Sequence, residues 1–184
     1  MENWDGVIAP ALPPGWVASN PDPGDGTMWV TTTVIPESAP NDAFIADQDG
    51  ISEKVLDRLG VTVMSPSAVM SWRNNYNTEM SGGIFWDGYV LEISSPNISG
   101  GDFLDFTDPH IGAFCLAGCY ANPPITGRSC WCGNSGGYID TVINLGPNLA
   151  GQTVTLRFRM FSDEAVAAPG VHIDNILITG ASCP

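Results

Sequence analysis

Alternation of apolar and polar side chains over residues 153–160, in the segment TVTLRFRMF (153–161), is the feature that most limits how this chain folds. The apolar side chains of Val154, Leu156, Phe158 and Met160 share one face, and Thr155, Arg157 and Arg159 share the other. Successive side chains of a β-strand point to opposite faces, so the segment predicts a strand with one buried and one solvated face. Such strands are typical of antiparallel sheets packed in pairs.

Strand-like patterns recur along the chain between clusters of turn residues. They are MWVTTTVI (28–35), AVMSWRNNY (68–76), GYVLEISS (88–95), YIDTVINL (138–145) and VHIDNILIT (171–179). The best helix candidate, SEKVLDRL (52–59), is short and ends at Gly60. With 21 Gly and 15 Pro in 184 residues, turns are plentiful. We therefore expect an all-β, two-sheet antiparallel β-sandwich of jelly-roll type, forming a single domain over residues 1–184.

The net charge of −14, from 6 basic and 20 acidic side chains, limits the partners of this chain. Nucleic acid and anionic membrane surfaces would be repelled, whereas a divalent cation would be attracted. No apolar run is long enough to span a bilayer. Cysteine clustering indicates an oxidising compartment, so we expect a secreted or cell-surface protein whose export signal lies outside this chain.

Catalytic signatures are missing from the sequence. Neither a G-x-S-x-G elbow nor an H-E-x-x-H motif is present, and no pair of acids stands out for glycoside hydrolysis. His172 precedes Asp174 by two positions, so the two side chains share a strand face and could touch. A hydrogen-bonded structural histidine is the simpler interpretation. We expect no catalytic residues and no enzymatic activity.

The cysteines gather in one loop at about residues 100–135. Four belong to it: Cys115, Cys119, Cys130 and Cys132. Strand geometry would point the last two thiols to one side of Trp131, which is a tight arrangement for a four-thiolate zinc site. A disulfide such as Cys115–Cys132 or Cys119–Cys130 is favoured, although the sequence leaves the connectivity open. The fifth, Cys183, has no partner in this scheme.

The acidic segment NDAFIADQDG, residues 41–50, provides oxygen ligands suited to calcium. It contains Asn41, Asp42, Asp47 and Asp49. The D-x-D-G pattern at its end resembles a calcium loop but lacks the downstream Glu of an EF-hand. A solvated acidic loop is the alternative interpretation.

Aromatic side chains could provide a platform for stacking sugars. The candidates are Trp29, Trp72, Tyr76, Trp86, Tyr89 and Trp131. Most fall within strand patterns, where packing in the core is the default. Trp86 and Trp131 fall in expected loops and are therefore the best candidates for contact with a ligand.

An ordered set of segments resembles a group of secreted bacterial modules. WDGVIAPALPPGW (4–16) is similar to their F-[DE]-G-x(n)-P-x-G-W opening, and the similarity continues through SWRNNYNTE, DGYVLEIS, GRSCWCGNSGG and GVHIDNILI. These are the MAM-like, cleaved-adhesin and choice-of-anchor J domains, which also occur in immune-inhibitor-A-type metallopeptidases. The chain departs from their pattern at Trp4, where Phe is usual, and at the cysteines flanking Trp131.

The resemblance implies a concanavalin-like or MAM-like jelly roll with a structural calcium ion. In such domains the first and last strands are neighbours, so Asp5 would meet Asp174 and Asn175 across the ion while residues 41–47 pass nearby. We expect residues 4–16 to form the first strand, with Trp4 in the core.

The implied role is adhesion, recognition or assembly, stabilised by calcium and disulfides. The partner would be a protein or glycan at the cell surface, or a neighbouring domain or subunit. The alternatives are a structural subunit of a surface assembly or filament and a carbohydrate-binding accessory domain of a secreted hydrolase.

Overall fold

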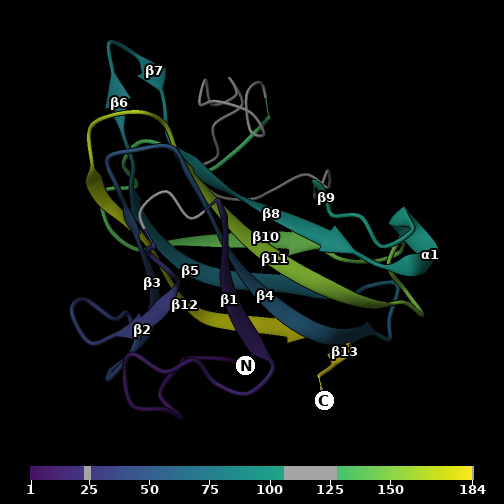
Figure 1. The fold of residues 1–184 in the computed structure, drawn as a ribbon. Coiled ribbons are helices and arrows are strands. Elements are labelled where there is room, and N and C mark those ends of the chain that lie inside the picture. Colours follow the sequence, from purple (N-terminus) through teal and green to yellow (C-terminus); the bar gives the residue numbers. More distant parts are fainter. Residues whose placement is uncertain (23–25, 106–127, 184) are drawn as a thin grey trace.

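The computed structural model describes residues 1–22, 26–105 and 128–183 and contains two antiparallel sheets (Figure 1). The first sheet has the strand order β1–β4–β11–β8–β9, and β13 pairs with β4. Its strands are β1 (Trp16–Asp22), β4 (Ser52–Val63), β8 (Gly88–Ser94), β9 (Leu104–Asp105), β11 (Thr153–Ser162) and β13 (Ala181–Ser182). The second sheet has the order β10–β5–β12–β3–β2. Its strands are β2 (Val30–Thr32), β3 (Asp42–Asp47), β5 (Val69–Asn77), β10 (Ile139–Asn144) and β12 (Ala168–Thr179).

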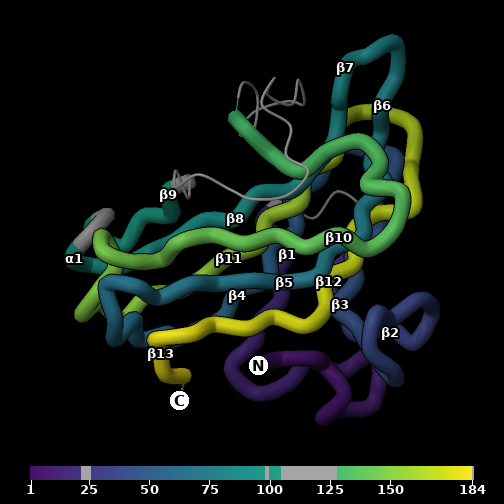
Figure 2. The backbone as a smooth tube through the Cα atoms, turned by 180° about the vertical axis from the view of Figure 1, so that it is seen from behind, coloured from purple at the N-terminus to yellow at the C-terminus, as the bar shows by residue number. Residues whose placement is uncertain are grey.

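The two sheets pack face to face over one apolar core (Figure 2). The alternation of β11 places its side chains as predicted: Leu156 and Phe158 are at most 1% exposed, and Arg157 lies on the other face with its partner Asp57. Aromatic side chains from both sheets meet in the core, where Trp72 of β5 packs edge-on against Phe158. The predicted fold class, a two-sheet antiparallel β-sandwich, is confirmed.

The segment expected as the best helix candidate is instead part of strand β4. Its acids pair with arginines of the neighbouring strand: Asp57 bonds Arg157 through two 2.7 Å contacts, and Glu53 pairs with Arg159. Leu56, between these acids, points into the core and is fully buried. These acids thus stabilise the pairing of two strands by facing opposite charges across the sheet.

The N-terminal segment forms turns where a strand was expected. Residues 4–15 contain no strand, and β1 begins at Trp16. Three prolines in this segment lack the N–H that a strand donates to its neighbour. Trp4 is nevertheless fully buried in the core, as predicted. Glu2 pairs with Ile176 of β12 through backbone hydrogen bonds of 2.7 and 2.8 Å, so the first and last segments are neighbours.

A short hairpin and a single helical turn complete the described chain. The hairpin, β6 (Met80–Ser81) and β7 (Ile84–Phe85), projects from the sandwich at the end away from the two termini (Figures 1 and 2). The turn is α1 (Pro96–Ser99). Within the described residues, no helix has the length and apolar character needed to cross a bilayer.

Candidate functional site

The acids expected to hold calcium at the termini accept hydrogen bonds from nearby N–H and O–H groups. Asp174, fully buried in β12, accepts the Ser38 N–H and the Asn175 N–H, both at 2.7 Å. Asp5 accepts the Asn41 N–H at 3.0 Å and the Asn3 side-chain amide at 2.7 Å. Each of the two carboxylates thus accepts hydrogen bonds from residues next to it. A cation between Asp5 and Asp174 stays a prediction.

Asp42 forms the partnership with His172 that the sequence analysis had considered for Asp174. The Asp42 Oδ2 atom lies 2.7 Å from His172 Nδ1 and accepts the Tyr138 hydroxyl at 2.5 Å. Asp42 lies near His172 because β3 pairs with β12, in which His172 lies opposite Phe44. Burial and the neighbouring Asp42 raise the pKa of the Tyr138 hydroxyl. The histidine is therefore hydrogen-bonded within the sheet.

The remaining predicted ligands are not gathered with the terminal acids. Asp47 ends β3 and is 1% exposed, whereas Asp49 is exposed in the bend that follows. The Asp47 Oδ2 atom accepts the Glu79 N–H at 3.0 Å. Asp47 therefore belongs to a second acidic group, at the end of the sandwich that carries the β6–β7 hairpin.

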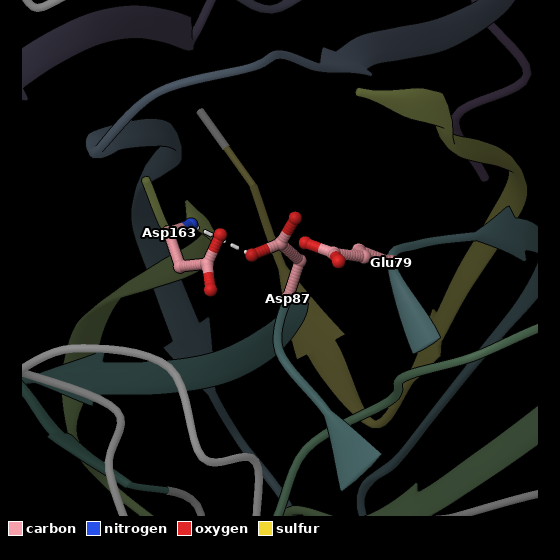
Figure 3. A group of neighbouring side chains, drawn as sticks. All are labelled: Glu79, Asp87 and Asp163. Carbon is pink, nitrogen blue, oxygen red and sulfur yellow. Dashed lines mark hydrogen bonds between the residues drawn. The ribbon is translucent and has the colours of Figure 1, made fainter. Parts of the chain in front are cut away.

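This second group is formed by acids at strand ends and was missed by the sequence analysis (Figure 3). Glu79 follows β5, Asp87 precedes β8 and Asp163 follows β11. One carboxylate oxygen from each lies within 4.8 Å of the others. The Asp163 N–H donates to Asp87 Oδ1 at 2.7 Å. Antiparallel pairing of β11 with β8 places Asp87 and Asp163 together. No local sequence pattern indicates which strands pair, so this group could not be found from the sequence.

Burial disfavours negative charge in this acidic group. It raises the pKa of the Asp87 carboxyl to about 9, and the neighbouring Asp47 adds to the rise. Burial also raises the pKa of Asp47 to about 6, against the opposing effect of nearby Lys54. The pKa of Glu79 is raised as well, by burial and by Asp163. Lys54 itself is fully buried, with its ammonium donating to Ser162 Oγ at 3.3 Å.

An open groove of about 270 Å³ lies at the base of the hairpin, beside Glu79. Its lining includes Thr78, Glu79, Met80, Gly133, Asn134 and Val166. Met80 is 53% and Val166 60% exposed, so the groove has an apolar rim. Val166 adopts φ 66, a left-handed conformation that is strained for a β-branched residue. Trp86, whose backbone N–H donates to the Glu79 carbonyl at 3.2 Å, is partly exposed at the base of the hairpin.

The second predicted contact residue, Trp131, lies in the core. It is 1% exposed and stacks on Tyr89 with ring centroids 5.0 Å apart. Trp131 and Tyr89 exchange backbone hydrogen bonds, so the expected loop extends the sheet here. Its indole cannot serve as a contact surface. The other candidate aromatics, Trp29, Trp72, Tyr76 and Tyr89, are also buried.

The structure describes two of the four cysteines of the predicted staple. Cys130 and Cys132 are buried together on the outer face of the sheet with Val90, while Trp131 points into the core. The thiols thus lie to one side of Trp131, as predicted. Cys115 and Cys119 lie outside the described residues, so the disulfide staple stays a prediction. Cys183 is an exposed free thiol.

The fold and these sites define an antiparallel β-sandwich, and comparison with known proteins supports this class. No protein-family model matches the chain, and no curated protein matches it either. The structure is similar to two cleaved adhesin domains of the Lys-gingipain of Porphyromonas gingivalis. One has a TM-score of 0.54 at 14% identity, covering 97% of this chain and 95% of that domain. The other has a TM-score of 0.54 at 16% identity, with coverages of 97% and 96%.

A carbohydrate-binding module of the β-sandwich superfamily is also similar. Its TM-score is 0.53 at 11% identity, covering 96% of this chain and 60% of the other. At these identities the similarity shows a shared fold.

Proposed function

We propose that this chain is a non-catalytic extracellular module that recognises glycans or proteins at a cell surface, and that it belongs with the cleaved-adhesin, MAM-like and choice-of-anchor J modules. The groove beside the β6–β7 hairpin is the observation that carries the proposal. It combines polar side chains with the exposed apolar side chains of Met80 and Val166. Recognition sites commonly join an apolar surface to a few placed polar groups.

Glycans are the favoured class of ligand for this groove. The Glu79 and Asn134 side chains provide carboxylate and amide groups suited to sugar hydroxyls. Trp86, partly exposed beside Glu79, provides an aromatic ring for stacking. The strained backbone of Val166 costs about 1–3 kcal/mol, and such strain concentrates at functional sites.

Glycan and extracellular-protein arrays probed with the full chain test this proposal. We expect binding to at least one glycan, weakened about tenfold, or about 1.4 kcal/mol, by Trp86→Ala or Met80→Ala. Met64→Ala is the matched control, because Met64 is 69% exposed in the turn after β4, at the other end of the sandwich. Binding only to proteins would replace the glycan by a protein partner. Binding to neither, or equal weakening by Met64→Ala, would overturn the proposal.

A structural calcium ion near the termini is the second part of the proposal. Asp42 Oδ1 is buried without a hydrogen-bond partner. Burial raises the pKa of Asp174, and the nearby Asp42 adds to the rise, so a cation there would relieve repulsion. Calcium should raise the melting temperature of the chelator-treated protein, and Asp174→Asn should blunt that response. A melting temperature that chelator leaves unchanged would contradict this part.

A disulfide staple among Cys115, Cys119, Cys130 and Cys132 is the third part. The burial of Cys130 on the outer face of the sheet is compatible with a bond to the preceding loop. Mass spectrometry of the exported protein with and without reductant counts the bonds. Four unmodified thiols at these positions would exclude the staple.

A further inference from the structure

The acids at the hairpin end come from three separate strand ends and converge on one point. Oxygens of Glu79, Asp87 and Asp163 lie within 4.8 Å of one another (Figure 3). Ligands on opposite sides of a calcium ion lie about 4.6–5.2 Å apart, since calcium–oxygen distances are about 2.3–2.6 Å. One ion could therefore contact all three carboxylates. Magnesium, with distances of about 2.0–2.1 Å, requires a tighter and more regular shell.

Asp47 provides an independent observation that points to a ligand. It is 1% exposed, and its Oδ1 atom is buried without a hydrogen-bond partner. Its carboxyl faces the cluster, because Oδ2 accepts the Glu79 N–H and the group lies within hydrogen-bonding reach of Asp87. A buried oxygen without a donor is costly unless a ligand satisfies it. Glu79 Oε2 is a second buried oxygen without a partner.

Charge is out of balance at this end of the sandwich. The carboxyl groups of Glu79, Asp87 and Asp163 converge on one point, and Asp47 interacts with Asp87. Lys54 acts on Asp47 as a neighbouring positive charge. Protons or a cation must offset the repulsion between buried carboxylates. A divalent ion would offset two charges and satisfy the buried oxygens at the same time, whereas a shared proton would satisfy one contact.

We propose that Glu79, Asp87 and Asp163, with Asp47 beside them, bind one calcium ion. The ion would join the end of β5 to the start of β8 and the end of β11, and so connect the two sheets. This site is distinct from the predicted terminal site, whose acids Asp42 and Asp174 contact other partners. Glu79 also lines the groove proposed for ligand recognition, so a bound ion would lie beside that groove.

Calorimetric titration of the chelator-treated full chain with CaCl2 and MgCl2 tests the proposal. We expect calcium to bind more tightly than magnesium, and Asp87→Asn to remove one binding event that Asp174→Asn retains. Terbium luminescence excited through tryptophan is a second readout, because Trp86 directly precedes Asp87. Glu79→Gln, at a partly exposed position, should weaken calcium binding about tenfold and serves if Asp87→Asn fails to fold.

Two outcomes would overturn the calcium site. One is a wild-type chain that binds no calcium, with a melting temperature that is the same in calcium and in chelator. The other is a folded Asp87→Asn or Glu79→Gln variant that binds as much calcium as the wild type, and as tightly. Asp57→Asn, which removes an acid of the outer sheet face, is the matched control and should change neither the affinity nor the number of ions bound.

Discussion

Asp47 and Asp87, at the hairpin end, keep their protons at pH values where ordinary carboxyl groups lose them. This gives the stability of the metal-free protein an unusual pH dependence. An unfolded Asp releases its proton near pH 4, whereas Asp47 and Asp87 in the fold titrate at about 6 and about 9. Between about pH 4 and about pH 9 the folded state therefore binds more protons than the unfolded state. The free energy of unfolding should fall as the pH rises through this window.

Chemical denaturation in chelator at a series of pH values measures this trend. Glu79, Asp163 and Lys54 also face the pair, so the decline reflects the whole group. Asp87→Asn removes the carboxyl with the highest pKa and should flatten the upper part of the curve. A free energy of unfolding that rises with pH across this window would contradict the prediction.

Sequence patterns predicted the character of single side chains better than they predicted which residues those side chains contact. Trp4 was correctly placed in the core, and the D-x-D-G pattern drew attention to Asp47. Glu79 and Asp87 carried no local signal, because only the order of strands brings them together. Trp131 was misplaced for the same reason, since its pairing with Tyr89 is a tertiary contact.

Between strands, the close pairing of β12 with β3 depends on Gly170. A Cβ atom there would lie 2.1 Å from the Ile45 carbonyl oxygen, and the residue adopts φ +108. Gly170→Ala should therefore lower the free energy of unfolding by about 1–3 kcal/mol more than a glycine with similar backbone strain and open space. Gly137, at φ +129 with nothing within 4 Å, provides that control. Equal losses for the two variants in urea denaturation would refute the steric argument.

The outer face of the first sheet contains ion pairs of different burial, and their contributions should differ. Glu92 of β8 is 3% exposed and bonds Arg128 and Arg159, each at 2.7 Å. Glu92→Ala would take one carboxylate from each of two guanidinium groups, although Arg159 keeps its pair with Glu53, and should cost about 3–5 kcal/mol. Asp57→Ala, which breaks the more exposed pair with Arg157, should cost about 0.2–1 kcal/mol. Denaturant midpoints measure both, and a larger loss for Asp57→Ala would reverse the argument.

At the level of strands, alternation of apolar and polar residues predicted the strands that have one buried face. It failed for β4, in which charged residues interrupt the apolar pattern. β5, β8, β10, β11 and β12 follow their predicted segments. β4 was misjudged because its acids and bases find partners on β11, which a single strand does not reveal. The proline-rich N-terminal segment was misjudged because its order comes from side-chain contacts with other segments.

Over the whole molecule, that N-terminal segment closes one end of the sandwich, and Asn41 holds it in place. Asn41 is 2% exposed, and its amide donates to the Trp4 carbonyl at 3.1 Å and to the Val7 carbonyl at 2.8 Å. Asn41→Ala leaves both carbonyls without this donor and should lower the free energy of unfolding by about 1–3 kcal/mol. Hydrogen exchange should quicken over residues 1–16 and along β12, because Glu2 pairs with Ile176. Asn148→Ala, at an exposed loop position, should change neither quantity, and unchanged exchange in Asn41→Ala would show that the segment is held by other contacts.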